Sequence, residues 1–335
     1  MIIRLSTLGN VAMLVPTLTQ LSMTYPDDRF VLVALKPLQP LLYGLDNFRF
    51  HEADAQVEAG RGLWQLAKQI AAYQPSKVFD LQGDYRGMLL RWMMRLRHIP
   101  TACIRRGAAE RRRLIRLGAE RCNRIKTESE RYYDTFVAGG LRPTGDVLPM
   151  KVNSEALSDV KQLFGEKKGH WIGIAPFAKH VSNVLPYKTM KELIGYYAHQ
   201  PDTRVFLFGG GHIEIEMLRQ WSSLWPNVES VSDRLSMGGE LELMRLIDGM
   251  ICMDSANQHL AAIVGCPILS IWCGTHPYMG FAAWGKANTQ MLSLPLTCRP
   301  CSIHGTNTCK YRNFACKAIT SEQIAERFNS MLSNK

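Results

Sequence analysis

The sequence lacks the features that would place it in a membrane or outside the cell. No uninterrupted apolar run in its 335 residues reaches the roughly 18 residues that a membrane-spanning helix needs. Residues 1–5 do not have the layout of a signal peptide and read as a first buried strand. With 46% hydrophobic and 21% charged residues, the composition is that of a globular protein. The length of 335 residues is enough for two domains of ordinary size. We therefore expect a cytoplasmic protein.

Several catalytic signatures are also missing. The chain has no Gly-x-Ser-x-Gly elbow and no Gly-x4-Gly-Lys-Ser/Thr loop, which argues against a hydrolase and a kinase. His180, His212 and His276 do not have the spacing of a metal site or of a nucleophilic triad. No internal repeat and no low-complexity tract is visible.

Four of the nine cysteines are clustered near the C-terminal end. Cys298, Cys301, Cys309 and Cys316 have a spacing at which four thiolates bind a structural zinc. The favoured interpretation is that they are reduced packing thiols, because a reducing cytoplasm disfavours disulfides. We accordingly predict no metal and no cofactor.

Positive charge is concentrated in one segment. Residues 86–126 hold twelve arginines and one lysine against two glutamates, a surplus equal to the net charge of +11 of the whole chain. Residues 86–97 interleave arginines with bulky apolar residues, which is typical of helices on anionic membrane surfaces. A packed helix with a solvated basic face is the plainer alternative. Nucleic acid is a competing partner, but no recognised nucleic-acid motif accompanies the charge, so none is predicted. A phosphate-bearing ligand would suit Arg105 and Arg106.

Short apolar runs alternate with amphipathic segments, which predicts an α/β protein with parallel sheets. The expected strands are 1–5, 29–35, 77–81, 101–105, 171–176, 204–209, 249–253 and 267–272. The expected helices are 11–24, 61–73, 85–96, 127–139, 154–163, 187–199, 213–224, 239–247, 257–264 and 320–332. We expect one domain over 1–150, a second over 165–318, and a terminal segment 319–335 whose helix can cross back.

Two turns, the first of which contains Gly9, each join a strand-like run to a helix-like run. They are residues 6–10 in the first half and 254–259 in the second. A helix N-terminus offers unpaired N–H groups and the positive end of its dipole to an anionic or polyhydroxylated ligand. The turn at Gly209 and Gly210, followed by Glu214, suits a nucleotide-sugar at the same edge of a parallel sheet. The alternative interpretation is that each turn is only a tight connection between a strand and a helix.

Taken in order, these motifs resemble glycosyltransferase family 9, the heptosyltransferases of the lipopolysaccharide inner core. Residues 254–262 are similar to the family motif D-S-G-x-x-H-L-A-A. The resemblance implies a GT-B fold, with two Rossmann-like domains whose parallel sheets face a central cleft. It also implies metal-independent, inverting transfer of a heptose from an ADP-sugar to an anionic lipid-linked saccharide, at the cytoplasmic face of the inner membrane.

The resemblance also assigns residues to the two substrates. The donor side would comprise Lys179, Asn183, Gly209, Gly210, Glu214, Asp254, Ser255, Ala256 and His259. The acceptor side would comprise Ser6, Thr7, Gly9, Arg105 and Arg106.

Three residues depart from the family pattern. Asn10 stands where the family has the aspartate that acts as general base, and such catalysis is typically worth about 10²–10⁴-fold in rate. Asn183 stands where a lysine neutralises the leaving diphosphate, a role for which Lys179 is a substitute. Ala256 replaces a glycine.

Two interpretations of these departures stay open. In one, another carboxylate replaces the base, and Asp84 is the nearest candidate because it follows a strand of the same domain. In the other, the protein is a catalytically impaired homologue that binds nucleotide-sugar or glycan without efficient transfer.

Overall fold

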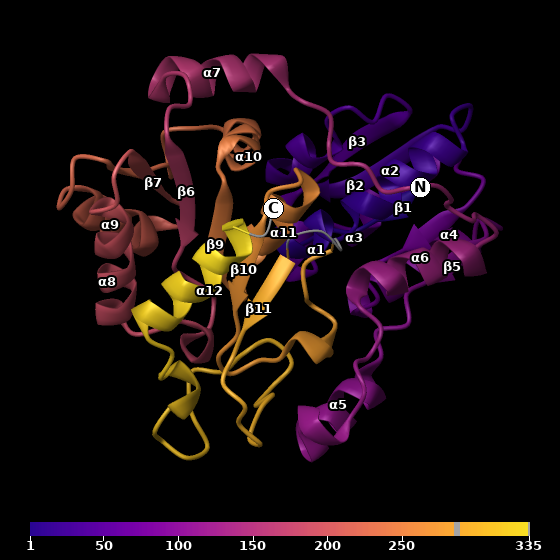
Figure 1. Cartoon of the computed structure of the whole chain (residues 1–335). Coiled ribbons are helices and arrows are strands. Elements are labelled where there is room, and N and C mark those ends of the chain that lie inside the picture. Colours follow the sequence, from indigo (N-terminus) through magenta and orange to yellow (C-terminus); the bar gives the residue numbers. More distant parts are fainter. Residues whose placement is uncertain (285–288, 334–335) are drawn as a thin grey trace. The chain divides into compact units, whose positions relative to one another are not determined.

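The protein consists of two compact α/β units in the computed structural model, which describes residues 1–284 and 289–333 (Figure 1). The first unit comprises Met1–Gly107 and Lys126–Lys151. The second comprises Ala108–Ile125 and the chain from Val152 onward. Residues 108–125 were expected in the first domain, but they pack with the second unit.

The first unit is built on a five-stranded parallel sheet with the order β3-β2-β1-β4-β5. Its strands are β1 (Ile2–Ile3), β2 (Phe30–Leu35), β3 (Phe48–Ala53), β4 (Val78–Asp80) and β5 (Thr101–Cys103). The four expected strands are present. The sequence analysis missed β3, since the polar residues Arg49 and Glu52 interrupt its apolar character at exposed positions.

Six helices belong to residues 1–138. They are α1 (Leu8–Ala12), α2 (Val15–Thr24), α3 (Leu63–Ala72), α4 (Tyr85–Arg95), α5 (Ala108–Leu117) and α6 (Glu128–Ala138). The single helix expected over 11–24 was wrong, because the structure has α1 and α2 there. Pro16 lies in the first turn of α2, where its missing N–H group costs no hydrogen bond.

The second unit contains a six-stranded parallel sheet with the order β11-β10-β9-β6-β7-β8. Its strands are β6 (His170–Ala175), β7 (Thr203–Leu207), β8 (Val228–Ser230), β9 (Gly249–Met253), β10 (Ile268–Ile271) and β11 (Thr289–Leu292). The strands β8 and β11 were not expected from the sequence. Strand β9 is buried throughout, as its continuous apolar run predicts.

The helices of the second half agree with the expected ones within a few residues. They are α7 (Ser154–Phe164), α8 (Tyr187–Ala198), α9 (His212–Ser222), α10 (Met237–Leu246), α11 (Ala256–Ile263) and α12 (Ser321–Ser333). The terminal helix α12 packs on α8, β10 and β11 (Figure 1). Its residue Phe328 is buried and lies against Gly249 at the start of β9.

Helix α5 is attached to the second unit by backbone and side-chain contacts. The N–H of Ala119 donates to the carbonyl of Arg299, and that of Ile125 donates to the carbonyl of Tyr278. The guanidinium of Arg111 is buried over the ring of Phe281, 4.6 Å from its centroid. This helix was not expected, because its five charged residues obscure its short apolar side.

A search of the described helices finds none that is both long and apolar enough to cross a bilayer.

The packing of α12 yields a stability prediction. Phe328→Ala should lower the free energy of unfolding by about 3–5 kcal/mol, because it leaves a cavity in a closed core. Chemical denaturation of the whole chain measures this loss. Arg327→Ala, at an exposed position of the same helix, is the control. A loss below about 1 kcal/mol for Phe328→Ala would show that α12 does not contribute to this core.

Candidate functional site

In the first unit, the expected acceptor residues lie where three neighbouring strands end. Strand β1 lies between β2 and β4, so the chain crosses over in opposite directions on its two sides. Ligands of open parallel sheets bind at the carboxyl edge beside such a switch point. Residues 6–10 follow β1 here, residues 81–84 follow β4, and Arg105 and Arg106 follow β5.

A buried hydrogen-bond chain connects these strand ends. The Oε1 atom of Gln82 accepts from Nη1 of Arg4 at 2.9 Å, and its Nε2 atom donates to Oδ2 of Asp84 at 2.9 Å. Nε of Arg4 donates to the hydroxyl of Tyr132 at 3.1 Å, and this hydroxyl donates to the backbone carbonyl of Asn10 at 3.2 Å. The backbone at Asn10 and the carboxylate of Asp84 are thus held by one network.

Asn10 lies in the first turn of α1 with a partly exposed side chain. Its Nδ2 atom donates to Oγ1 of Thr7 at 3.0 Å. Thr7 is the N-cap residue of α1 and is itself exposed, whereas Ser6 and Gly9 are buried. An amide at position 10 cannot take up a proton, so the Asn10 side chain cannot act as a general base.

Both carboxylate oxygens of Asp84 are occupied. Oδ1 caps α4 by accepting from the N–H groups of Arg86 and Gly87 at 3.0 and 3.2 Å. Oδ2 accepts from Gln82 and from Nε and Nη2 of Arg86, the latter at 2.6 Å. Burial alone raises the pKa of this carboxyl, but these hydrogen bonds outweigh burial and lower the pKa below its usual value. A carboxylate so stabilised is a weak base.

The two arginines after β5 are exposed at the same edge. The side chain of Arg106 lies over Gly83, since a Cβ atom on Gly83 would come within 3.2 Å of its Cδ atom. The carbonyl of Arg105 accepts from Nη1 of Arg131 at 3.0 Å. The expected phosphate-binding arginines are therefore next to the loop that carries Asp84.

In the second unit, Asp254 directly follows β9 at the carboxyl edge of the sheet. Strand β9 lies between β6 and β10 there. Its Oδ2 atom accepts from Oγ1 of Thr275 at 2.6 Å and from Nδ2 of Asn183 at 3.3 Å. Its Oδ1 atom accepts from Nε2 of Gln258 at 3.1 Å. Burial raises the pKa of this carboxyl to about 6, although the bonds from Thr275 and Gln258 act in the opposite direction. The sequence analysis did not single out Thr275 or Gln258 as partners of Asp254.

Asn183 is buried and links Asp254 to the loop between β11 and α12. Its Nδ2 atom also donates to the carbonyl of His304 at 3.0 Å, and its Oδ1 atom accepts from Oγ of Ser182. The same Oγ atom accepts from the N–H of Thr306 at 2.8 Å. With 2% of its surface exposed, Asn183 has a structural role here, because its side chain joins three segments of the chain.

Helix α11 begins at Ala256 with polar side-chain atoms that have no partner among the described residues. The Oγ atom of Ser255, the Oε1 atom of Gln258 and the Nδ1 atom of His259 are all buried and unpaired. Burial lowers the pKa of His259 to about 3, so its imidazole is neutral at physiological pH. Unpaired buried polar atoms are costly, and a ligand that bonds them removes the cost.

The remaining donor residues lie on two neighbouring loops. Gly209 and Gly210 follow β7, and the N–H of Gly210 donates to Oε2 of Glu214 at 2.9 Å. Burial raises the pKa of the Glu214 carboxyl, with the bond from Gly210 opposing it. Lys179 is exposed on the loop after β6.

The clustered cysteines do not form a metal centre in the part of the chain that the structure describes, because no group of three or more His, Cys, Asp or Glu side chains there is arranged to hold a metal ion. Cys298, Cys301, Cys309 and Cys316 are all free thiols. The N–H of Cys301 donates to the carbonyl of Gly274, so the cysteine loop packs against the chain beside Thr275.

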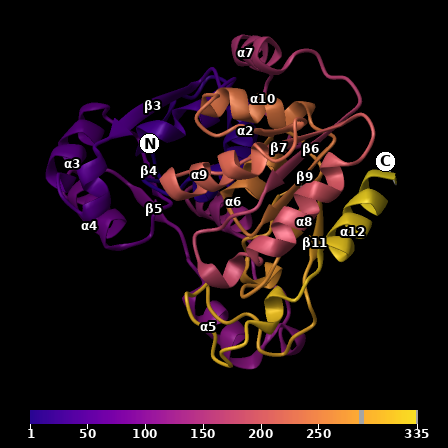
Figure 2. The same ribbon diagram turned by 90° about the vertical axis from the view of Figure 1, so that its left-hand side faces the viewer.

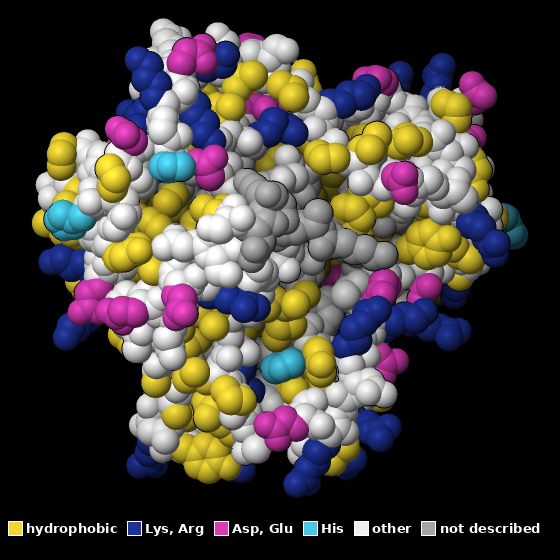
Figure 3. Space-filling model, in the orientation of Figure 1, with side chains coloured by type: hydrophobic (Ala, Val, Ile, Leu, Met, Phe, Trp, Pro, Cys, Tyr) yellow, Lys and Arg dark blue, Asp and Glu magenta, His cyan; other side chains and the backbone are white. Residues whose placement is uncertain are grey.

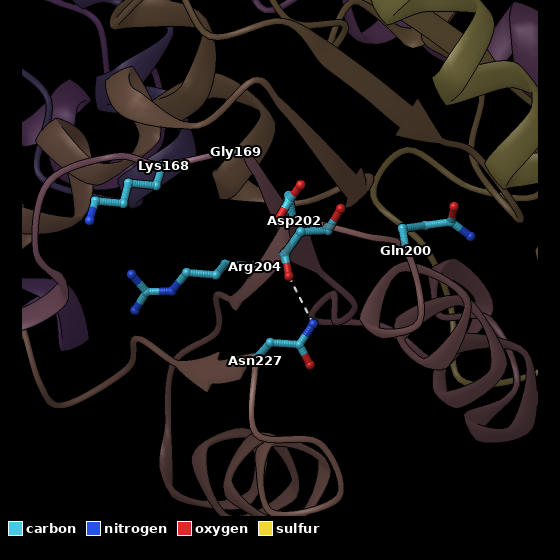
Figure 4. Close-up of a pocket in the computed structure, with 7 residues that line it drawn as sticks. Lys168, Gly169, Gln200, Asp202, Arg204 and Asn227 are labelled. Atoms are coloured by element: carbon cyan, nitrogen blue, oxygen red, sulfur yellow. Dashed lines mark hydrogen bonds between the residues drawn. The ribbon is translucent and has the colours of Figure 1, made fainter.

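A pocket at the opposite edge of the second sheet contains none of the expected donor residues. Lys168, Asp202 and Arg204 line it at the amino ends of β6 and β7 (Figure 4). The amide of Asn227 donates to the carbonyl of Thr203 there. Arg204 is held by the carbonyl of Phe164 and by Glu229, which leaves it a structural role.

Comparison with known proteins gives a family and a fold. The model of the family described as glycosyltransferase family 9 (heptosyltransferase) matches residues 63–312. None of the curated protein sequences matches the chain.

Similar solved structures cover nearly the whole chain. The glycosyl transferase family 9 protein from Veillonella parvula DSM 2008 has a TM-score of 0.77 at 16% identity and covers 100% of this chain and 97% of its own. The E. coli ADP-heptose lps heptosyltransferase II has a TM-score of 0.73 at 16% identity, covering 99% and 98%. E. coli heptosyltransferase WaaC with ADP has a TM-score of 0.68 at 16% identity, covering 98% and 96%. These likenesses confirm the expected GT-B fold.

The raised pKa of Asp254 predicts a pH dependence of stability. Between about pH 4 and 6, the folded state retains a proton that the unfolded chain releases, so this group makes stability fall as pH rises through that window. Asp254→Asn removes the contribution, and its stability relative to the parent should rise by at most about 3 kcal/mol across the window. Urea unfolding at several pH values measures this difference. Asp159→Asn, on the exposed side of α7, is the control. A pH-independent difference for Asp254→Asn contradicts the prediction.

Proposed function

Because the chain belongs to glycosyltransferase family 9, we propose that it transfers a heptose or related sugar from an ADP-sugar to an anionic lipid-linked saccharide of the lipopolysaccharide-core type. The reaction is inverting and metal-independent. The protein acts in the cytoplasm, as a peripheral protein at the inner membrane. The relatives with ADP or an ADP-sugar bound support the choice of donor.

The single observation that carries this proposal is the unsatisfied polar start of α11. Three buried side-chain atoms without a described partner lie there, beside a carboxylate that three other side chains fix in place. A diphosphate would accept from His259 and from the free N–H groups of the first turn. Ala256 leaves less room beside this turn than a glycine would. It still retains the backbone N–H group of the first helical position, which can donate to the diphosphate.

The other proposed donor-binding residues contact different parts of the ADP-sugar. Glu214 has one carboxylate oxygen bonded by Gly210 and one available to ribose hydroxyls. Lys179, on its exposed loop, supplies positive charge for the leaving diphosphate. Asn183 has no free donor left for this purpose, since Asp254 and His304 take its Nδ2 hydrogens.

On the acceptor side, Ser6, Thr7 and Gly9 form the loop that meets the sugar hydroxyl, and Arg105 and Arg106 bind its phosphates. Asp84 is a positioning residue in this proposal: it caps α4 and holds Arg86, and its lowered pKa makes it a poor substitute for the missing base. Transfer then proceeds without a base at position 10 and is slow.

The second candidate is a protein that retains donor binding and has lost transfer altogether. The observation favouring it is again Asn10, whose amide is turned toward Thr7 and cannot accept a proton. Binding of ADP-heptose without turnover supports this candidate, and turnover with both substrates supports the transferase.

Donor binding is tested by calorimetric titration with ADP-heptose. His259→Ala should weaken binding about tenfold or more, because it deletes one hydrogen bond to a charged group, typically worth about 1.5–3 kcal/mol. His170→Ala, at the amino end of β6, should leave the affinity unchanged. The proposal fails if the parent protein does not bind ADP-heptose or if both variants bind like the parent.

The role of position 10 is tested by restoring the carboxylate. Asn10→Asp should raise turnover at least tenfold, because general-base catalysis contributes about 10²–10⁴-fold. The new carboxylate can accept from the Thr7 hydroxyl, which now accepts from Asn10. Transfer rates are compared with Asn10→Ala, which removes the amide without supplying a base, and with Asp84→Asn, which retains the helix cap.

An unchanged rate in Asn10→Asp would reject Asn10 as the impaired base. A loss of more than tenfold in Asp84→Asn, with α4 intact by circular dichroism, would assign the base to Asp84 instead.

A further inference from the structure

Helix α4 has a second apolar face that the fold does not use. Its inner face buries Gly87, Leu90 and Met94. Its outer side carries large apolar residues spaced three or four apart, which places them on one stripe. These residues and their exposed fractions are Tyr85 (54%), Met88 (55%), Leu89 (37%), Trp92 (57%) and, at the C-cap, Leu96 (62%). A stripe of this size exposed to water marks an interaction surface.

Helix α3 extends the stripe. It packs beside α4 (Figure 2) and exposes 58% of Trp64. The ring of Tyr85 reaches the turn before α3, because a Cβ atom on Gly60 would come within 2.5 Å of its hydroxyl. Within the described chain, Trp64 and Trp92 are the two tryptophans that are more than half exposed. We call the six residues Trp64, Tyr85, Met88, Leu89, Trp92 and Leu96 the α3–α4 surface.

The charged residues within the two helices of the α3–α4 surface are all basic. Neither helix contains an aspartate or glutamate. Arg86 and Arg91 are neutralised by Asp84 and Asp80. Lys68, Arg95 and Arg97 are exposed, and the ammonium of Lys68 lies 5.6 Å from the centre of the Trp64 ring. On the face that Figure 3 draws, basic and acidic side chains are interspersed.

This combination selects the occupant. A second copy of the chain would bring equal positive charges together, and like charges facing each other oppose association. An anionic bilayer matches both features: tryptophan and tyrosine favour the headgroup region, and lysine and arginine bind lipid phosphates.

We propose that the α3–α4 surface docks the protein on bilayers of anionic phospholipid. This proposal rests on the proposed function, since a lipid-linked acceptor requires a catalyst that reaches the membrane. The apolar stripe enters the headgroup region, while Lys68, Arg95 and Arg97 lie on the phosphates. Helix α4 begins at Tyr85, directly after its N-cap residue Asp84, which lies in the loop at the proposed acceptor edge of the same unit. The bilayer therefore contacts the helix that begins next to the proposed acceptor site.

Vesicle sedimentation of the full chain tests the proposal, with vesicles of phosphatidylglycerol and phosphatidylethanolamine compared with vesicles of phosphatidylcholine alone. The parent should bind the anionic vesicles at least about tenfold more strongly, with binding weakened by salt. The double variant Trp92→Ser/Leu96→Gln should lose at least about tenfold in affinity. Met23→Ser removes a similarly exposed apolar residue of α2 in the same unit, 51% exposed, and should bind like the parent.

Several outcomes would overturn the proposal. It fails if the parent ignores anionic vesicles, or if the double variant binds them as the parent does. It also fails if gel filtration shows a parent dimer that the double variant loses while vesicle binding is unchanged, since the occupant is then a second copy. Titration with ADP-heptose separates the two hypotheses. Normal donor affinity with no vesicle binding rejects only the docking surface, and vesicle binding without donor affinity rejects only the proposed function.

Discussion

The carboxyl edge of the second sheet depends on one buried carboxylate and the groups that satisfy it. Asp254 would be expensive to hold away from water without partners, and Thr275, Gln258 and Asn183 donate to it from three different segments. Those bonds draw the chain after β6, β9 and β10 to one point. The same arrangement turns Gln258 so that its Oε1 atom is buried and unpaired next to His259. The unpaired oxygen of Gln258 at the start of α11 is thus a by-product of satisfying Asp254.

This constraint also explains why an asparagine is buried at position 183. An amide offers two donors on one nitrogen, and Asn183 uses them for the Asp254 carboxylate and the carbonyl of His304. It thereby fastens the cysteine-rich loop to the carboxyl edge of the second sheet.

Elements with local signals were predictable from the sequence, and elements stabilised from a distance were not. Strand β9 is an unbroken apolar run, and α11 follows it at a marked turn, so both were expected. Strand β11 and helix α5 acquire their places from residues far along the chain, and no local pattern reports such contacts. The same holds for Asp84. Its position after β4 was predictable, but the hydrogen bonds that Arg86 donates to its carboxylate were not.

The chain passes between the two units three times, after Gly107, after Ile125 and after Lys151. A single peptide-bond cleavage therefore never releases one unit from the other. Dissection at Lys151 would leave α5 on the fragment that lacks Arg299 and Tyr278, whose carbonyls accept from the N–H groups of Ala119 and Ile125 just after the helix. Neither unit is formed by a single continuous stretch of the chain.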